Sequence, residues 1–446
     1  MAPNTSSDIL HMVIYEVYVR NHGPHGTFDD VTADLPRLKA MGVDVVWFMP
    51  IHSIGQLNKK GSLGCPYSCR DYRDINPEYG TSDDFAKLIQ RAHELGMKIM
   101  IDVVYNHTSH DSTLVKTHPE FFHQDAQGHP FTTVPEWSDV IDLKHPNPDL
   151  TRYLVDSLVG WAKFGVDGFR CDVASLLPLD FWLQARREVE QVKPGVIWLA
   201  ESTHASFIES RRARGLSGIS DGELFNAFDI CYDYEIWGIF QQVVLGKLPV
   251  RRYLELLRFQ KAIYPSTYAK MRCVENHDNA RIMRMAPNRP QALAWTAFQA
   301  FCKGPFLIYG GQESAAVHTP SLFDIDKVEW QDYAIQDFLI RLAHLKKDRA
   351  QVDGRFVIHT AEPLIQAGWE HPQGSLFGIF NPNAEKGTIA VPLPDGDYPD
   401  VLNDGILAVS GGSTAAPASA AIVRCRPALG LQPFYSELLD FQLHLA

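Results

Sequence analysis

Residues 82–107 read SDDFAKLIQRAHELGMKIMIDVVYNH and contain the pattern that decides the fold. Ser82, followed by two acidic residues, is the predicted N-cap of a helix, and Gly96 predicts the end of that helix. Its apolar positions have helical spacing: Phe85, Leu88, Ile89, Ala92 and Leu95. The apolar segment 98–105 then predicts a buried strand that ends in polar residues. This stretch is therefore one helix–strand unit of an α/β protein.

The same alternation recurs along the chain. Apolar runs predict strands over 13–19, 43–49, 98–105, 166–171, 196–200, 224–231, 270–274 and 306–309. Helical spacing of apolar residues separates them, and a last helix is expected over 335–345. Eight such units predict a (β/α)8 TIM barrel. A doubly wound sheet is the alternative, but no G-x-G-x-x-G follows the first strand.

Two regions do not follow this alternation of strands and helices. The connection 107–150 is much longer than an ordinary loop, which is typical of a functional insertion. After residue 349, short strands are expected over 356–359, 364–369, 376–380, 388–391 and 421–424, with a loop over 410–421. They predict a C-terminal antiparallel β-sandwich. The predicted domains are a barrel of 1–106 and 146–350, a short inserted loop domain of 107–145 after the third strand, and a sandwich of 351–446.

Composition excludes several classes of protein. The 446 residues are 45% hydrophobic and 21% charged, which is typical of a globular protein. The net charge of −12 argues against a nucleic-acid partner or an anionic membrane surface. The chain has no run of about 18 apolar residues for a membrane span and no secretory signal pattern at its start. Seven cysteines, an odd number, then favour reduced thiols in the cytoplasm.

Polar residues follow the predicted strands where each one ends. In a barrel these ends meet at one mouth, so the residues should converge there. An isolated aspartate at such a place is usually a helix cap, but separate caps would not gather in one mouth. The residues in question are Asp102, Asn106, His107, Arg170, Asp172, Glu201, His277 and Asp278.

Several carboxylates in one mouth indicate glycosidic-bond chemistry, in which one carboxylate attacks the sugar and another donates a proton. Arg170 should keep its neighbour Asp172 ionised, whereas nearby negative charge and burial should keep Glu201 protonated. The residues alone therefore favour Asp172 as nucleophile and Glu201 as general acid and base.

These motifs resemble those of the α-amylase superfamily, glycoside hydrolase family 13. Similar stretches are 102–107 (DVVYNH), 168–172 (GFRCD), 200–201 (AE) and 275–278 (ENHD), together with 66–81 and 137–143. The resemblance extends over about residues 12–350 and more loosely over the C-terminal region.

The resemblance implies a role for each matching residue. Asp172 corresponds to the nucleophile, Glu201 to the acid and base, and Asp278 to a third carboxylate that binds sugar hydroxyls. The implied substrate-binding residues are Tyr67, which stacks on a sugar ring, His107 and His277, which bond the sugar, and Arg170, which orients Asp172. The implied fold is a barrel with an inserted domain after the third strand and a C-terminal sandwich.

The sequence also departs from typical starch-liquefying amylases. Ser175 and Leu176 replace a Lys-His pair that binds leaving-group sugars in many animal and fungal members. The expected activity is retaining hydrolysis of α-1,4 bonds in maltodextrins or related α-glucans. α-Glucosidase, transglycosylase or isomerase activity in the same superfamily and a non-enzymatic barrel are the alternatives.

The sequence gives only weak signals for a cofactor, a metal ion or an oligomer. The chemistry requires no cofactor, and no Cys/His spacing predicts zinc. Asn106 and Asp142 match calcium-binding positions of many relatives, although many intracellular relatives lack the ion, so both alternatives stay open. Cys65 and Cys69 flank Tyr67, with two reduced thiols expected and a disulfide as the alternative. The lack of an N-terminal sandwich domain weakly favours a monomer.

Overall fold

The computed structural model describes residues 2–426 and 428–440, which form two compact units. The first unit comprises residues 2–9, 14–235 and 320–329. The second comprises residues 10–13, 236–319 and 330–440 except residue 427. Each unit is described by itself.

A parallel sheet forms the centre of the first unit. Its strands lie in the order β1 (Val13–Val17), β2 (Val45–Phe48), β3 (Lys98–Val103), β6 (Gly168–Cys171), β7 (Ile197–Ala200) and β8 (Ile230–Cys231). Met100 pairs with Gly168 and Phe169 with Trp198, so β3, β6 and β7 are in register. Nearly every strand position is buried, as expected for a parallel sheet covered by helices. The residues that follow β3, β6 and β7 therefore emerge at one edge.

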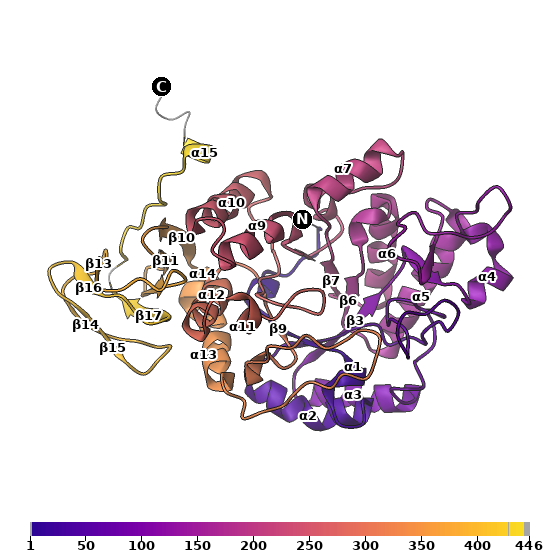
Figure 1. Ribbon diagram of the computed structural model, residues 1–446, viewed down its shortest axis with the longest axis horizontal. Helices are drawn as coiled ribbons and strands as arrows, with labels where there is room; N and C mark the ends of the chain where they lie inside the picture. Colours follow the sequence, from indigo (N-terminus) through magenta and orange to yellow (C-terminus); the bar gives the residue numbers. More distant parts are fainter. Residues whose placement is uncertain (1, 427, 441–446) are drawn as a thin grey trace. The chain divides into compact units, whose positions relative to one another are not determined.

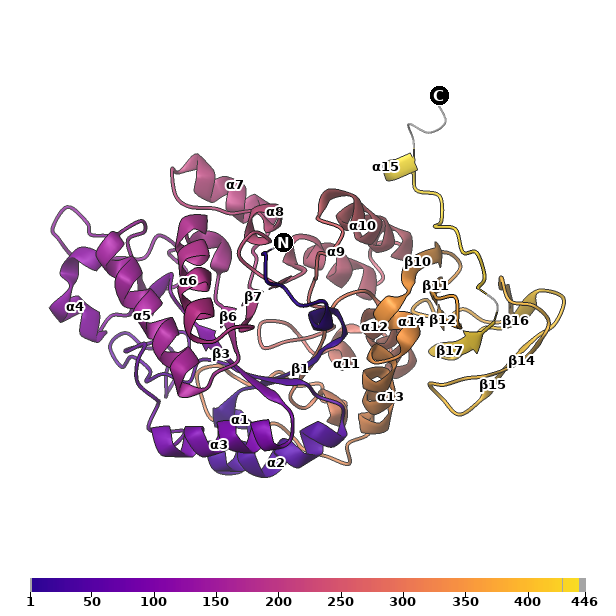
Figure 2. The ribbon, with the colours of Figure 1, turned by 180° about the vertical axis from the view of Figure 1, so that it is seen from behind.

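Helices connect these strands, as their apolar spacing predicts. They are α2 (Phe28–Ala40), α3 (Ser82–Glu94), α5 (Pro148–Phe164) and α6 (Leu179–Val192). Figures 1 and 2 both show α2 beside α3 and α5 beside α6. The N-cap of α3 is Thr81 rather than Ser82, because Thr81 and Asp84 bond each other's backbone amides in a capping box. In the described part of the chain, no helix is both long and apolar enough to cross a membrane.

The long connection after β3 contains its own small elements. Strand β4 (His107–Ser109) pairs in antiparallel fashion with β5 (Val140–Asp142), which places His107 opposite Asp142. Helix α4 (Thr113–Thr117) lies between these two strands in the sequence. This pairing brings the end of the inserted segment back to the residues that leave the sheet at β3.

The sixth predicted strand is much shorter than expected. Only Ile230–Cys231 forms β8, whereas residues 221–224 form the short helix α8 (Asp221–Leu224). The Ser220 and Glu223 side chains form a capping box that starts this helix. A turn over residues 225–227 follows this helix, so the predicted strand is reduced to its last two residues.

The barrel part of the second unit contains β9 (Phe306–Tyr309) with helices α9 (Tyr234–Val244), α10 (Val250–Ile263), α12 (Arg289–Phe301) and α13 (Gln336–Lys346). The strand predicted over residues 270–274 is wrong as a regular strand, because the segment pairs only at isolated bridges such as Arg272 with Phe306. Pro305, the acceptor for the Arg272 N–H, has no N–H of its own. The hydrogen-bonded ladder between this segment and β9 therefore cannot continue past Pro305.

The C-terminal region is antiparallel, as predicted. Strands β10 (Arg355–Thr360), β11 (Ile365–Glu370), β12 (Ser375–Phe380) and β17 (Ala420–Cys425) form one sheet. β13 (Thr388–Ala390) pairs with β16 (Ser413–Ala415), and β14 (Gly396–Pro399) pairs with β15 (Ile406–Val409). One apolar core contains residues from all three sheets, including Phe377, Ile389 and Leu407. The loop predicted over 410–421 is corrected, because it contains β16.

Candidate active site

Arg170 joins three strand ends of the first unit. Its side chain is fully buried in β6, and Nη1 lies 2.9 Å from Asp102 Oδ1 and 2.9 Å from Asp172 Oδ1. Nη2 lies 3.0 Å from Glu201 Oε2. Burial alone would lower the pKa of Arg170, but the carboxylates of Asp102 and Glu201 raise it well above its usual value. One permanent cation thus holds three carboxylates together.

This arrangement corrects the electrostatic argument made from the sequence. Arg170 was expected to favour the ionised form of Asp172 alone, yet it contacts Asp172 and Glu201 at nearly equal distances. The guanidinium therefore does not distinguish the nucleophile from the acid. Any difference between the two carboxyls must come from their other neighbours.

Val173 supplies one such difference. Its backbone N–H donates to Glu201 Oε2 at 2.7 Å, and its φ of +37° lies in the left-handed region. A β-branched residue rarely adopts this conformation, which costs about 1–3 kcal/mol where it occurs. The strained turn directly after Asp172 therefore aims a hydrogen-bond donor at Glu201.

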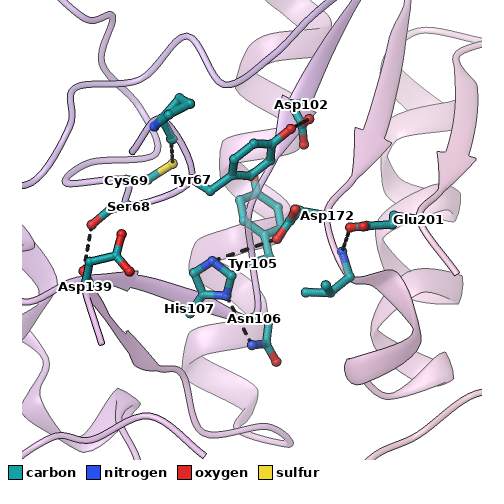
Figure 3. Close-up of polar contacts among 12 residues, drawn as sticks. Tyr67, Ser68, Cys69, Asp102, Tyr105, Asn106, His107, Asp139, Asp172 and Glu201 are labelled. Atoms are coloured by element: carbon teal, nitrogen blue, oxygen red, sulfur yellow. Dashed lines mark hydrogen bonds and ion pairs between the residues drawn. The ribbon is translucent and has the colours of Figure 1, made fainter. Parts of the chain in front are cut away.

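His107 lies on the other side of Asp172 (Figure 3). Its Nε2 is 3.9 Å from Asp172 Oδ2, and its Nδ1 is 3.3 Å from Asn106 Nδ2. The Trp137 ring lies 5.3 Å from the His107 ring, between centroids. Burial lowers the pKa of His107, although Asp142 and other acids oppose this effect. A neutral imidazole can donate a hydrogen bond to a sugar without adding charge.

Tyr67 and the cysteines beside it complete this side of the first unit. The Tyr67 hydroxyl donates to Asp102 Oδ2 at 3.0 Å, and the Arg170 guanidinium carbon lies 5.5 Å from the centre of the Tyr67 ring. Cys65 and Cys69 are both free thiols, as expected, and burial raises the pKa of Cys65 to about 12. All seven cysteines of the chain lie among the described residues, and each is buried.

Two residues of this cluster have no role assigned from the sequence. Asp102 bonds both Arg170 and Tyr67 and has no solvent exposure. Its position at the end of a buried strand was the available signal, because a carboxylate there needs a cationic partner. Trp137 gave no comparable signal, since it lies in a long loop.

His277 and Asp278 lie in the second unit. His277 is buried, whereas the Asp278 side chain is 38% exposed, and His277 Nε2 lies 3.3 Å from Asp278 Oδ1. The Asn276 side chain accepts from the Asp278 N–H at 3.1 Å and from Asn279 at 2.7 Å. Trp237 Nε1 in turn donates to Asn279 at 2.7 Å. A hydrogen-bonded turn therefore fixes the backbone of Asp278.

Glu275 anchors the same turn. It forms an ion pair with Arg281 at 2.7 Å, and its other oxygen accepts from the Ile282 N–H at 2.8 Å. Burial raises the pKa of Glu275, although Arg281 opposes this effect. The structure thus gathers Tyr67, Asn106, His107, Asp142, Arg170, Asp172 and Glu201 in the first unit and His277 with Asp278 in the second.

Comparisons with known families agree with this geometry. Residues 5–136 and 123–350 match the family described as alpha amylase, catalytic domain. Residues 357–423 match the bacterial alpha amylase C-terminal domain.

Two solved structures resemble most of the chain. An alpha-amylase from Lactobacillus plantarum is 41% identical with a TM-score of 0.90, over 94% of this chain and 100% of that one. A noncanonic maltogenic alpha-amylase, AmyB, from Thermotoga neapolitana is 34% identical with a TM-score of 0.83, over 94% and 99% of the two chains. This likeness confirms the predicted (β/α)8 barrel with C-terminal antiparallel sheets. The three predicted domain boundaries stay a prediction.

A curated relative differs in its named activity. An alpha-1,4-glucan:maltose-1-phosphate maltosyltransferase from Cereibacter sphaeroides is 32% identical over 224 residues, which cover 46% of this chain and 33% of that protein. The chain spans about a third to a half of the length of the first curated relatives that it matches.

Proposed function

The chain belongs to the α-amylase family, and on this premise we propose that it is a retaining hydrolase of α-1,4-linked maltodextrins. The observation that carries the proposal is the pair Asp172 and Glu201, held at the ends of neighbouring strands by one buried arginine. A carboxylate pair is the machinery of glycoside hydrolysis. The names of the similar amylases support the choice of α-glucan.

In the first proposed step, a carboxylate oxygen of Asp172 attacks the anomeric carbon while the bond to the leaving oxygen breaks. Glu201 gives its proton to that oxygen. In the second step, Glu201 takes a proton from water, and the oxygen of this water displaces Asp172 from the sugar. Arg170 and the Val173 N–H hold Glu201 through Oε2 during both steps.

The remaining site residues would bind the sugar. Asp278 and His277 would bond its hydroxyls, His107 would donate from a neutral ring, and Tyr67 would stack on its apolar face. Because its hydroxyl is bonded to Asp102, the orientation of the Tyr67 ring is fixed before substrate binds. Pre-ordered contacts of this kind reduce the entropic cost of reaching the transition state.

Product analysis on maltoheptaose tests the proposal. We expect new reducing ends and shorter maltodextrins, with the α-anomer formed first when the reaction is followed by NMR. A first-formed β-anomer would exclude double displacement. The Asp172→Asn variant is the control for contaminating amylase.

The relative with maltosyltransferase activity supports one alternative, glucan transfer. In that case a sugar hydroxyl rather than water would displace Asp172. Longer chains formed from maltoheptaose without new reducing ends would favour transfer over hydrolysis. Transfer of the maltosyl group of maltose 1-phosphate to a glucan, with release of inorganic phosphate, would do the same.

We further propose a cytoplasmic location, which the free thiols of Cys65, Cys69, Cys171 and Cys425 support. Soluble oligosaccharides are then the expected substrates. A monomer remains the expected state of assembly.

A further inference from the structure

Two arginines connect the helix α7 (Ala205–Ala213) region to the inserted segment of the first unit. Arg211 Nη1 donates to Thr133 Oγ1 at 2.9 Å, and Arg214 Nη2 donates to the Thr133 carbonyl at 3.1 Å. Arg211 is only 5% exposed, and its Nε donates to the Ser217 carbonyl at 3.1 Å. A permanent positive charge is therefore buried against Thr133.

Thr133 also contacts Asp142. The Thr133 N–H donates to Asp142 Oδ2 at 2.8 Å, and the Thr133 hydroxyl donates to the same oxygen. Asp142 is 2% exposed, and its Oδ1 is buried without a hydrogen-bond partner. A buried carboxylate in this condition needs a nearby positive charge. Burial lowers the pKa of Arg211, and the charge of Asp142 opposes this effect.

The residues do not fit a calcium ion at this place. Calcium takes six to eight oxygen ligands. Asn106 instead places its amide nitrogen 3.3 Å from His107 Nδ1, and Asp142 Oδ2 is already bonded to Thr133. Among the residues that the structure describes, no three acidic, histidine or cysteine side chains gather as metal ligands. A divalent cation here would also be repelled by the Arg211 guanidinium, which stays charged.

We propose that Arg211 takes the place of a metal ion at the Asn106 and Asp142 positions and fixes the inserted segment without calcium. Asp142 pairs with His107 across β4 and β5, so the guanidinium acts on a substrate-binding residue through one strand pair. Arg211 is thus a positioning residue. The proposal concerns what holds the segment and does not depend on whether the enzyme hydrolyses or transfers.

The purified full-length protein provides the first test. We expect no stoichiometric calcium by elemental analysis after gel filtration. The melting temperature should be the same in excess EDTA and in millimolar calcium chloride. Bound calcium, or a melting temperature several degrees lower in EDTA, would overturn the proposal.

Variants of adjacent residues on α7 provide the second test. Arg211→Met should lower the melting temperature by several degrees, because it leaves the buried Asp142 carboxylate without its counter-charge. Adding Asp142→Asn should restore part of this loss, and Arg211→Lys should retain more stability than Arg211→Met. The matched control is Arg212→Met, since Arg212 is 51% exposed in an ion pair with Glu223 and should change little.

The double variant separates this role from ordinary packing. If Asp142→Asn does not improve a destabilised Arg211→Met, Arg211 only fills space and the proposal is wrong. An Arg211→Met variant as stable as the parent would contradict it as well. If Arg211→Met does not fold, the wild-type metal content and the stability of Arg211→Lys still decide the question.

Discussion

The two regions that contain the proposed catalytic carboxylates are built differently. In the first unit, Asp172 and Glu201 are both buried and share contacts with Arg170. In the second unit, the Asp278 side chain is 38% exposed and lies beside His277. The Asp278 N–H donates to the Asn276 side chain, which fixes the backbone of the turn. The first region is a charged network inside the fold, and the second is a carboxylate presented at its surface.

This difference indicates where stability and activity depend on the same residues. Removing a member of the Arg170 network leaves buried charges without partners, which is costly to the fold. Removing the Asp278 charge affects few buried groups and should change mainly the interaction with substrate. The variants of Asp172, Arg170 and Asp278 described next test this contrast.

The largest effect is expected for Asp172→Asn. Loss of the nucleophile should lower kcat by about a thousandfold or more while the protein still folds. Asp102 and Glu201 remain to pair with Arg170 in this variant. Steady-state kinetics on maltoheptaose and circular dichroism are the measurements. Activity near that of the parent would remove Asp172 from the proposed mechanism.

Arg170→Met should have the largest effect on stability. Three buried carboxylates lose their shared cation, so the free energy of unfolding should fall by about 3–5 kcal/mol. Urea denaturation measures this loss. Arg152→Met is the control, because Arg152 is 50% exposed and its ion pairs should contribute less than about 1 kcal/mol. Equal losses in both variants would contradict the contrast.

Asp278→Asn should separate activity from stability. We expect kcat/KM to fall by about a hundredfold, since one charge that binds the transition state is lost. The free energy of unfolding should change by less than about 0.5 kcal/mol at this partly exposed site. Glu275→Gln, three residues earlier, should instead destabilise the protein through loss of its buried pair with Arg281. A strongly destabilised Asp278→Asn would be the opposite result.

The smallest effect concerns pH and His145, whose Nε2 bonds the Tyr105 carbonyl at 3.0 Å near the end of β3. Burial lowers the pKa of His145 to about 4. As the pH falls, His145 therefore gains a proton near pH 6.5 in the unfolded chain but only near pH 4 in the folded protein. Stability from this group is complete above that window and declines as pH falls through it.

The decline should be at most about 1.4 kcal/mol per pH unit for this one proton. Urea midpoints measured at several pH values should show a shallower slope for His145→Gln than for the parent. His129→Gln is the control, because the His129 side chain is 78% exposed. An unchanged slope in His145→Gln would mean that this ring does not contribute.

Local sequence pattern was sufficient for much of the sheet and for the ends of its strands. The predicted strand at 98–105 is observed as β3 (Lys98–Val103), and the polar residues after β3, β6 and β7 do gather in the first unit. Burial on both faces leaves an almost continuous apolar run, which is easily recognised. Apolar spacing gave the helices in the same way.

Other features depend on partners that are distant in sequence. The extent of pairing at 270–274 is limited by Pro305, and the contact of Arg211 with Thr133 joins residues 78 apart. The left-handed backbone of Val173 also has no sequence signal, because valine is disfavoured there. Its conformation is imposed by the surrounding fold, so pattern alone could not reveal the donor to Glu201.

The seven buried thiols have a practical consequence for following how this protein opens. A thiol reagent should react with the native chain only when a cysteine becomes transiently accessible, so its labelling rate reports opening events. Cys171 lies in β6 and Cys425 in β17, one in each unit. Peptide mapping after brief labelling would therefore tell, without any engineered probe, which unit opens first during heating.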